Sequence, residues 1–176
     1  MCGIAGVLNL SGHPVEDPEL ATRMASALVH RGPDEGGFLK DGPLAFGFRR
    51  LSIIDVDGGH QPVPNETQTI WTMLNGEIYN FLELRNELQQ RGHHFQTNSD
   101  TEVIVHAYET HGLDFVQHLR GMFAIAIWDS QKGSRFGPRS YRKKAIILEP
   151  MQRSAGFCVR NQGHALLAKS RSNIKC

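Results

Sequence analysis

Apolar positions along the chain change their spacing from segment to segment, and this spacing predicts where strands and helices lie. A small-residue-rich apolar run begins at the second residue and predicts a buried strand. Two runs around the turn sequence Lys40-Asp41-Gly42-Pro43 predict a hairpin. A later run without polar interruption is typical of a strand that is buried on both faces. The predicted strands are residues 2–9, Gly36–Leu39, Leu44–Phe48, Leu51–Asp55, Thr69–Leu74 and Met122–Trp128.

Four other segments carry apolar residues at helical spacing. In the second of them Phe81, Leu84 and Leu88 share one face, and Gly92 closes the helix. Asp100 stands at the start of the third and is a candidate N-cap. The predicted helices are Pro18–Val29, Asn80–Arg91, Asp100–Thr110 and Asp114–Leu119. Strands and helices are segregated and do not strictly alternate, which predicts an α+β fold with sheets covered by helices.

The size and composition of the chain indicate one globular domain. It has 176 residues, of which 40% are hydrophobic and 21% are charged, and this is enough for one substantial core. No apolar run reaches the roughly 18 to 20 residues of a membrane-spanning helix. The N-terminus has neither the basic region nor the long apolar stretch of a secretory signal. We therefore expect a cytoplasmic protein with no membrane partner.

Motifs for metal or nucleotide cofactors are missing from the sequence. Three cysteines (Cys2, Cys158 and Cys176) form neither an even disulfide framework nor a CxxC pair. The histidines at positions 60, 93, 94 and 106 show no ligand spacing with Asp, Glu or Cys, so we predict no metal site. No glycine-rich phosphate-binding loop occurs. We therefore expect this chain to hold no cofactor.

Charge divides the chain into two unequal parts. Residues 1–132 contain 9 basic and 17 acidic residues, whereas residues 133–176 contain 10 basic residues and the single acid Glu149. A basic tail often indicates nucleic-acid binding. Here the basic residues follow no helical face and the apolar periodicity stops, so we expect no nucleic-acid partner. Residues 133–176 are interpreted as an atypical basic tail, either disordered or out of frame with the rest.

Cys2 is the most informative residue because of its position. A lone cysteine is usually a small buried apolar residue. If Met1 is removed, however, Cys2 carries both a thiol and a free α-amine. That amine has an ordinary pKa of about 7.7 to 8.0 and can take the thiol proton near neutral pH. One residue then supplies a nucleophile and its own general base, and no histidine partner is needed.

Other residues could stabilise the oxyanion of such a reaction or bind the charged groups of its substrate. Asn75 and Gly76 offer a side-chain N–H and an accessible backbone N–H for an oxyanion, but on the dipeptide alone we expect Asn-Gly to be a hairpin turn. One arginine of Arg49-Arg50 can clamp a carboxylate. Asp100 and Glu77 can accept hydrogen bonds from an ammonium group, with N-capping and helix entry as the alternatives.

Seven motifs together resemble one known family. They are MCGIAG at 1–6, HRGPD at 30–34, RRLSIID at 49–55, GGHQP at 58–62, NGEIYN at 75–80, SDTEVIVHAY at 99–108 and GMFAIAIWD at 121–129. In this order and spacing they resemble the N-terminal glutaminase domain of glutamine-hydrolysing asparagine synthetases, a class II amidotransferase. The resemblance covers residues 2–132. It implies an N-terminal-nucleophile hydrolase fold, a four-layer αββα sandwich.

The resemblance also implies roles for particular residues. Cys2 would form a γ-glutamyl thioester, and Asn75 with the Gly76 amide would form the oxyanion hole. Arg31 would support the Cys2 loop. The glutamine-binding residues would be Arg50 for the α-carboxylate, Glu77 and Asp100 for the α-amino group, and the backbone around Ile53 and Ile54 as the pocket wall.

The family pattern ends near Lys132, so we expect a fold that is incomplete at its C-terminal end and lacks its last sheet strands. In the family, ammonia passes to a synthetase domain that uses ATP and Mg²⁺ to amidate aspartate, and we find no such domain in this sequence. Glutamine is the expected ligand, and a separate synthetase domain or a second copy of the chain is the expected protein partner. Alternatives are an amidotransferase of an exopolysaccharide or protein-sorting gene cluster, and a non-catalytic interaction module.

Overall fold

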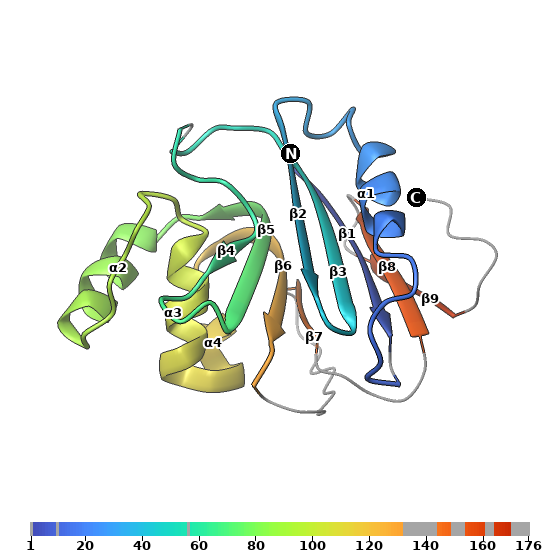
Figure 1. The fold of residues 1–176 in the computed structure, drawn as a ribbon. Coiled ribbons are helices and arrows are strands. Elements are labelled where there is room, and N and C mark those ends of the chain that lie inside the picture. Colours follow the sequence, from blue (N-terminus) through green and yellow to red (C-terminus); the bar gives the residue numbers. More distant parts are fainter. Residues whose placement is uncertain are drawn as a thin grey trace.

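Two β-sheets form the centre of the molecule (Figure 1). A computed structural model describes residues 2–9, 11–55, 57–131, 144–148, 154–160 and 164–169. The first sheet has the strand order β2-β3-β1-β8-β9, and all of its strand pairs are antiparallel. Its strands are β1 (Gly3–Asn9), β2 (Glu35–Asp41), β3 (Leu44–Arg50), β8 (Ser154–Arg160) and β9 (His164–Lys169).

The second sheet has the order β4-β5-β6-β7, with β6 and β7 parallel and the other pairs antiparallel. Its strands are β4 (Val63–Pro64), β5 (Ile70–Ile78), β6 (Gly121–Asp129) and β7 (Lys144–Leu148). The helices are α1 (Glu19–Ser26), α2 (Phe81–Gln90), α3 (Glu102–His111), the 3-10 helix η1 (Gly112–Asp114) and α4 (Phe115–His118).

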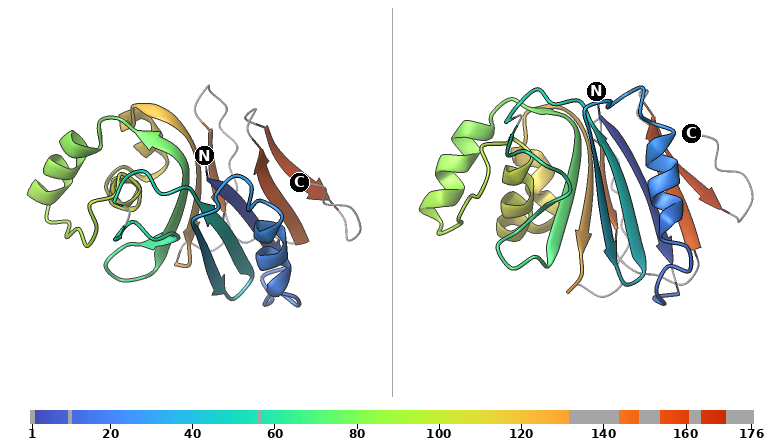
Figure 2. Two further views of the ribbon diagram at one scale, coloured as in Figure 1. Left: turned by 90° about the horizontal axis from the view of Figure 1, so that it is seen from above. Right: turned by 45° about the horizontal axis from the view of Figure 1, so that its top comes forward.

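The sheets pack face to face, and helices cover both outer faces (Figure 2). Helix α1 lies against the first sheet and buries Ala21, Met24 and Ala25. Helices α2, α3 and α4 lie on the outer side of the second sheet. The core between the sheets joins Phe46 and Phe48 of β3 to Trp128 of β6. The chain therefore forms the four layers α, β, β, α, built as one α+β unit.

The sequence pattern locates most elements and fails at four places. Leu51–Asp55 is not a strand. Strand β5 does not end before Asn75 but continues to Ile78, so the predicted Asn-Gly turn is wrong. The N-cap of α3 is Thr101, and Asp100 bonds elsewhere. The predicted burial of β6 on both faces fails at Met122, which is 72% exposed near the start of the strand.

The C-terminal quarter of the chain also departs from expectation. Three segments in it are strands: β7 extends the second sheet beside β6, while β8 and β9 extend the first sheet beside β1. The expectation that both sheets lack their last strands is therefore wrong. The remaining parts of the predicted tail 133–176 lie outside the described residues.

Candidate active site

Cys2 immediately precedes β1, at the end of the molecule where the loop after β3 also lies (Figure 1). Its side chain is half-buried against the core between the sheets, and its Sγ lies 3.8 Å from the carbonyl oxygen of Leu51. Arg31 Nε donates a hydrogen bond to the Cys2 carbonyl oxygen at 3.2 Å. The backbone at the thiol is thus held by a cation from the turn that follows α1, as we expected of Arg31.

Arg50 is the buried cation of this region, with 3% of its surface exposed. Its Nη1 donates to Glu35 Oε2 at 3.2 Å, and its Nη2 donates to the carbonyl oxygens of Ile54 and Asp55 at 2.8 and 2.7 Å. A buried guanidinium is tolerated only when such partners replace water. Arg50 therefore fixes the loop after β3 while its positive charge acts on the thiol of Cys2.

Asp100 is the buried anion of the same region. Its Oδ2 accepts a hydrogen bond from the Ile78 N–H at 2.9 Å, which ties the segment before α3 to the end of β5. Burial raises the pKa of the Asp100 carboxyl, and the charge of Glu77 adds to the rise, whereas the Ile78 N–H opposes it. Glu77 and Asp100 are thus close enough to repel each other. This pair is suited to receive a cation.

Asn75 and Gly76 lie inside β5, opposite Ala124 and Phe123 of β6. Asn75 is buried, and its Oδ1 has no hydrogen-bond partner among the described residues. Gly76 has φ +144°, and a Cβ at this position would lie 2.0 Å from the Met122 carbonyl oxygen. Glycine is therefore required here by the close approach of β6 and by the backbone conformation, and not by a hairpin turn.

Burial raises the pKa of the Cys2 thiol above its ordinary value. The backbone of Leu51 and the Arg50 guanidinium lower it, while Asp100 raises it. The thiol therefore lies within the fields of the Arg50 cation, at the end of β3, and of the Asp100 anion, in the segment before α3. Activation of this thiol requires a base that accepts its proton.

The two isoleucines of the predicted pocket wall have different environments. Ile53 is 63% exposed, whereas Ile54 is half-buried and its carbonyl oxygen binds Arg50. The structure thus places Cys2, Arg31, Arg50 and Ile54 in one connected group. Asp100 is linked to this group by its charge on the Cys2 thiol, and Glu77 is linked to it by its charge on Asp100. Asn75 and Gly76 lie in β5, just before Glu77.

Three positioning residues escaped the sequence prediction. Glu35 of β2 bridges Arg50 and His60, with a distance of 2.6 Å to His60 Nδ1. Asp55 joins the loop after β3 to the segment before α3, because its Oδ2 accepts the Asn98 N–H at 2.8 Å. A Cβ on Gly59 would lie 2.5 Å from Arg50 Nη2, so this glycine makes room for the guanidinium. The sequence shows an arginine beside a turn-rich segment, and once such an arginine is buried it needs partners of this kind.

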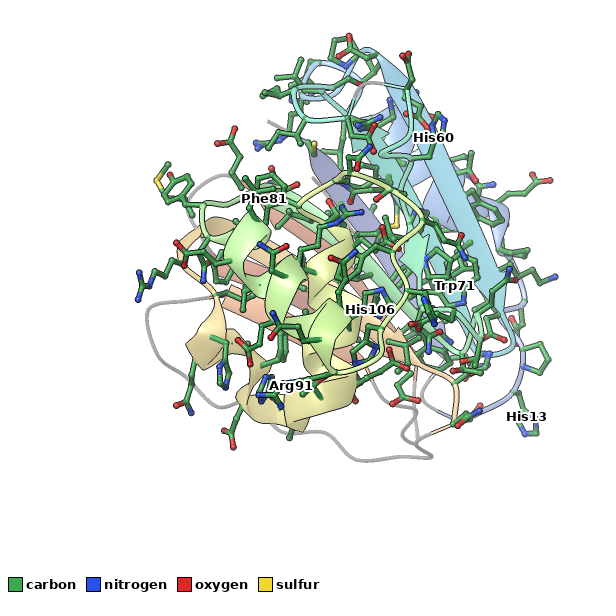
Figure 3. All side chains as sticks on the ribbon, turned by 90° about the vertical axis from the view of Figure 1, so that its left-hand side faces the viewer. His13, His60, Trp71, Phe81, Arg91 and His106 are labelled. Atoms are coloured by element: carbon green, nitrogen blue, oxygen red, sulfur yellow. The ribbon has the colours of Figure 1, made fainter. Side chains whose placement is uncertain are left out.

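The histidines occupy separate parts of the molecule. His60 lies on the loop near Arg50, and His106 lies on α3 (Figure 3). His93 and His106, which show no ligand spacing in the sequence, come together with Glu66 and Glu109. Spacing could reveal only the pair His106 and Glu109, three residues apart on α3, because the other two members come from segments that only the fold brings together with it.

Comparison with known proteins finds one family and a consistent set of relatives. A family model described as a glutamine amidotransferase domain matches residues 1–157, which extends beyond residue 132, where we expected the similarity to end. Asparagine synthetase [glutamine-hydrolyzing] 1 of Bacillus subtilis (strain 168) is 46% identical over 143 residues, covering 79% of this chain and 22% of that protein. Asparagine synthetase B [glutamine-hydrolyzing] of Escherichia coli (strain K12) is 42% identical over 132 residues, covering 75% and 24%.

The chain thus spans less than a quarter of the length of these relatives. A solved glutamine phosphoribosylpyrophosphate (PRPP) amidotransferase from B. subtilis, complexed with ADP and GMP, is similar with a TM-score of 0.60. It is 23% identical, and the similarity covers 73% of this chain and 35% of that one. This likeness concerns the fold. No helix in the part of the chain that the structure describes combines the length and apolar character needed to span a bilayer.

Substituting Gly76→Ala should destabilise the chain by more than backbone strain alone. The matched control is Gly92→Ala, because Gly92 also has positive φ (+98°) but a Cβ added there would meet nothing within 4 Å. We expect the Gly76 variant to lose about 1–3 kcal/mol more than the control, through overpacking against β6. Urea unfolding followed by circular dichroism measures both. Equal losses would show that β6 does not constrain this position.

Asp100→Asn should stabilise the ligand-free chain at neutral pH. The folded-state pKa of Asp100 lies above its unfolded value, so ionising this carboxyl costs stability as the pH rises through that window. The amide keeps an acceptor for the Ile78 N–H and carries no charge. The gain should vanish below about pH 4, where the wild-type carboxyl is protonated in both states. Urea unfolding across this pH range measures it, and a pH-independent loss would contradict the expectation.

Proposed function

Because the chain belongs to the family of glutamine amidotransferase domains, we propose that it hydrolyses the side-chain amide of glutamine to glutamate and ammonia. The observation that carries this proposal is the pair of opposite charges around the thiol. Arg50 ends β3 and Asp100 precedes α3, and both charges act on the Cys2 thiol. Free glutamine carries one carboxylate and one ammonium group, so it is complementary to this pair. Arg50 binds the α-carboxylate, and Asp100 with Glu77 binds the α-ammonium.

In the proposed reaction Cys2 is the first residue of the mature chain. Its α-amine accepts the thiol proton, and the thiolate attacks the amide carbon of glutamine. The Asn75 side-chain amide and the Gly76 N–H stabilise the oxyanion of the tetrahedral intermediate. The protonated α-amine of Cys2 returns its proton to the leaving nitrogen, and the C–N bond breaks to release ammonia. A γ-glutamyl thioester remains on Cys2. Water then attacks the thioester, and glutamate is released.

The two proposed donors are positioned by the sheet. Asn75 and Gly76 are paired with β6, and the Asn75 side chain is buried. A donor that is fixed before the substrate arrives needs no reorganisation in the transition state. Loss of one such donor typically raises the barrier by about 2.7–4 kcal/mol.

The relatives indicate a destination for the ammonia. Both of these bacterial relatives are glutamine-hydrolysing asparagine synthetases, of which this chain matches less than a quarter. We infer that the chain supplies ammonia to a synthetase partner that amidates aspartate. ATP and Mg²⁺ would act in that partner, and we assign them to no residue of this chain.

The first test is the glutaminase activity of the purified chain. We expect glutamate release from glutamine, loss of that activity in Cys2→Ala, and retention in the matched control Cys176→Ala. Hydroxylamine should intercept the thioester as γ-glutamyl hydroxamate, because a thioester is an acyl donor. A folded wild-type chain that begins at Cys2 and forms neither product would favour a non-catalytic interaction module.

The second test concerns the α-amine. A removable leader peptide placed before Cys2 leaves the thiol in place but converts its amine to an amide. We expect kcat to fall at least about 100-fold with the leader attached, since general-base catalysis contributes that much. Cleavage that leaves Cys2 first should restore activity, with mass spectrometry confirming the terminus. Equal turnover before and after cleavage would refute the role of the amine.

A further inference from the structure

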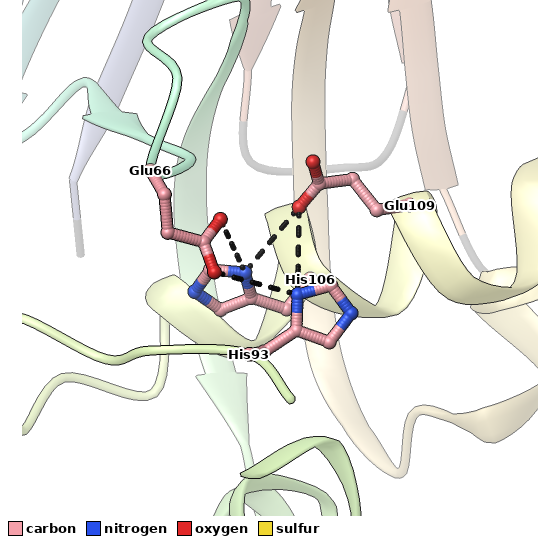
Figure 4. A group of neighbouring side chains, drawn as sticks. All are labelled: Glu66, His93, His106 and Glu109. Atoms are coloured by element: carbon pink, nitrogen blue, oxygen red, sulfur yellow. Dashed lines mark hydrogen bonds and ion pairs between the residues drawn. The ribbon is translucent and has the colours of Figure 1, made fainter. Parts of the chain in front are cut away.

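Four side chains outside the candidate active site converge on one point (Figure 4). Glu66 lies between β4 and β5, His93 follows α2, and His106 and Glu109 lie on α3. One donor atom from each lies within 4.8 Å of the others. His106 is almost fully buried, with 1% of its side chain exposed, and the other three are partly covered. We call these four residues the His-Glu cluster.

The separations inside the cluster fit a shared cation better than hydrogen bonds. His93 Nδ1 lies 3.5 Å from Glu66 Oε1 and 3.8 Å from Glu109 Oε2. His106 Nδ1 lies 3.5 Å from Glu66 Oε2 and 3.4 Å from Glu109 Oε2. Hydrogen bonds of this type are about 2.7–3.2 Å long. Ligand atoms at the corners of a tetrahedron around zinc, each 2.0–2.1 Å from the metal, are about 3.3–3.4 Å apart. The four His–Glu separations lie near this spacing, although Glu66 uses a different oxygen toward each histidine, and one donor atom from each residue lies within 4.8 Å of the others.

The tautomer of His93 is fixed by a neighbour. Thr110 Oγ1 has one proton and donates it to the His106 carbonyl oxygen at 2.9 Å. Its contact with His93 Nε2, also 2.9 Å, must therefore be a bond in which the nitrogen donates. In the neutral ring this leaves a lone pair on Nδ1. That lone pair points at two carboxylates, which is unfavourable unless a proton or a metal cation lies between them.

His106 has a different environment. Its buried Nε2 has no hydrogen-bond partner among the described residues, and Glu102 Oε1 lies 3.7 Å from it. A metal ion on Nδ1 would place the ring proton on Nε2, toward this carboxylate. Glu102 is itself fixed, since it accepts bonds of 2.7 Å from the N–H groups of Gln96 and Thr97. A histidine ligand oriented by a carboxylate is a usual feature of zinc sites.

Both carboxylates of the cluster are also oriented from outside. Asn65 Nδ2 donates to Glu109 Oε1 at 2.7 Å, which leaves Glu109 Oε2 to face both imidazoles. The His94 N–H donates to Glu66 Oε1 at 3.0 Å. Three of the four side chains (His93, Glu66 and Glu109) thus have an outer hydrogen-bond partner that turns them toward the common centre.

The total charge of the His-Glu cluster also suits a divalent cation. Two neutral imidazoles and two carboxylates carry a charge of −2 in total, which one divalent cation neutralises. Imidazole with carboxylate is a ligand set that suits zinc, whereas magnesium prefers oxygen ligands and water.

We propose that Glu66, His93, His106 and Glu109 bind one zinc ion through four protein ligands. A site closed by four protein ligands is structural, not catalytic. It would fasten the β4–β5 connection and the segment after α2 to α3. This site is independent of the glutaminase reaction, because none of its ligands takes part in the proposed chemistry.

The test is zinc binding by the full chain, purified without a histidine tag and stripped with a chelator. Zn²⁺ is titrated against a chromophoric chelator, and Co²⁺ is added separately to read the coordination geometry by visible absorption. We expect one tightly bound zinc per chain, and the intense absorption of tetrahedral Co²⁺. Excess Mg²⁺ should not displace the zinc.

Variants separate the cluster from other zinc-binding groups of the chain. His93→Gln removes a ligand, and the matched control His94→Gln removes the neighbouring imidazole, which is not a member of the cluster. We expect His94→Gln to bind zinc like the wild type and His93→Gln to lose the site. Thr110→Val, which removes only the outer partner of His93, should weaken zinc binding about 10- to 100-fold.

Unfolding of the metal-free variants shows whether each is folded, and zinc should raise the melting temperature of the wild type and His94→Gln but not of His93→Gln. The proposal is wrong if the stripped wild type takes up no zinc. It is also wrong if folded His93→Gln binds zinc as tightly as His94→Gln.

Discussion

The buried guanidinium of Arg50 is the constraint on which the candidate active site depends. Arg50 is 3% exposed, so its guanidinium is largely removed from water. Hydrogen bonds to Glu35, Ile54 and Asp55 offset the free-energy cost of burying this charge. These partners come from β2 and from the loop after β3, so satisfying one charge fixes two segments. Arg50 also lies at the end of β3, the strand that pairs with β1 and so with the strand that Cys2 precedes.

The groups around the Cys2 thiol shift its pKa in opposite directions, so they do not simply favour the thiolate. Burial and Asp100 raise the pKa of Cys2, while Arg50 lowers it. A ligand that carries both signs of charge would engage Arg50 and Asp100 together, and so change both contributions at once. The resting site therefore keeps the thiol protonated, and deprotonation is left to a base next to it. In the proposed mature chain that begins at Cys2, the α-amine of this residue would be the base closest to the thiol by covalent geometry.

Sequence reasoning located the elements well and the long-range contacts poorly, for a physical reason. The periodicities of α2 and α3 and the apolar run of β6 report local burial, which the sequence encodes directly. Asn75-Gly76 was interpreted as a turn because turn preference is local, whereas the close approach of Met122 that requires glycine is not. Asp100 was interpreted as an N-cap for the same reason, although its partner is Ile78 in another strand. The sequence did not reveal the His-Glu cluster as a whole, because its members come from segments that are distant in sequence.

Helix α3 connects the two regions described above. Asp100 precedes its first turn and holds the end of β5, while Glu102 in that turn binds the backbone of residues 96 and 97 and faces His106 one turn later. The acids at the start of α3 therefore do not cap it, but fasten strands and loops to it. Because Glu102 is buried and accepts several bonds, its position is over-determined. A helix held in this way can present Asp100 to the active site without relying on the loops around it.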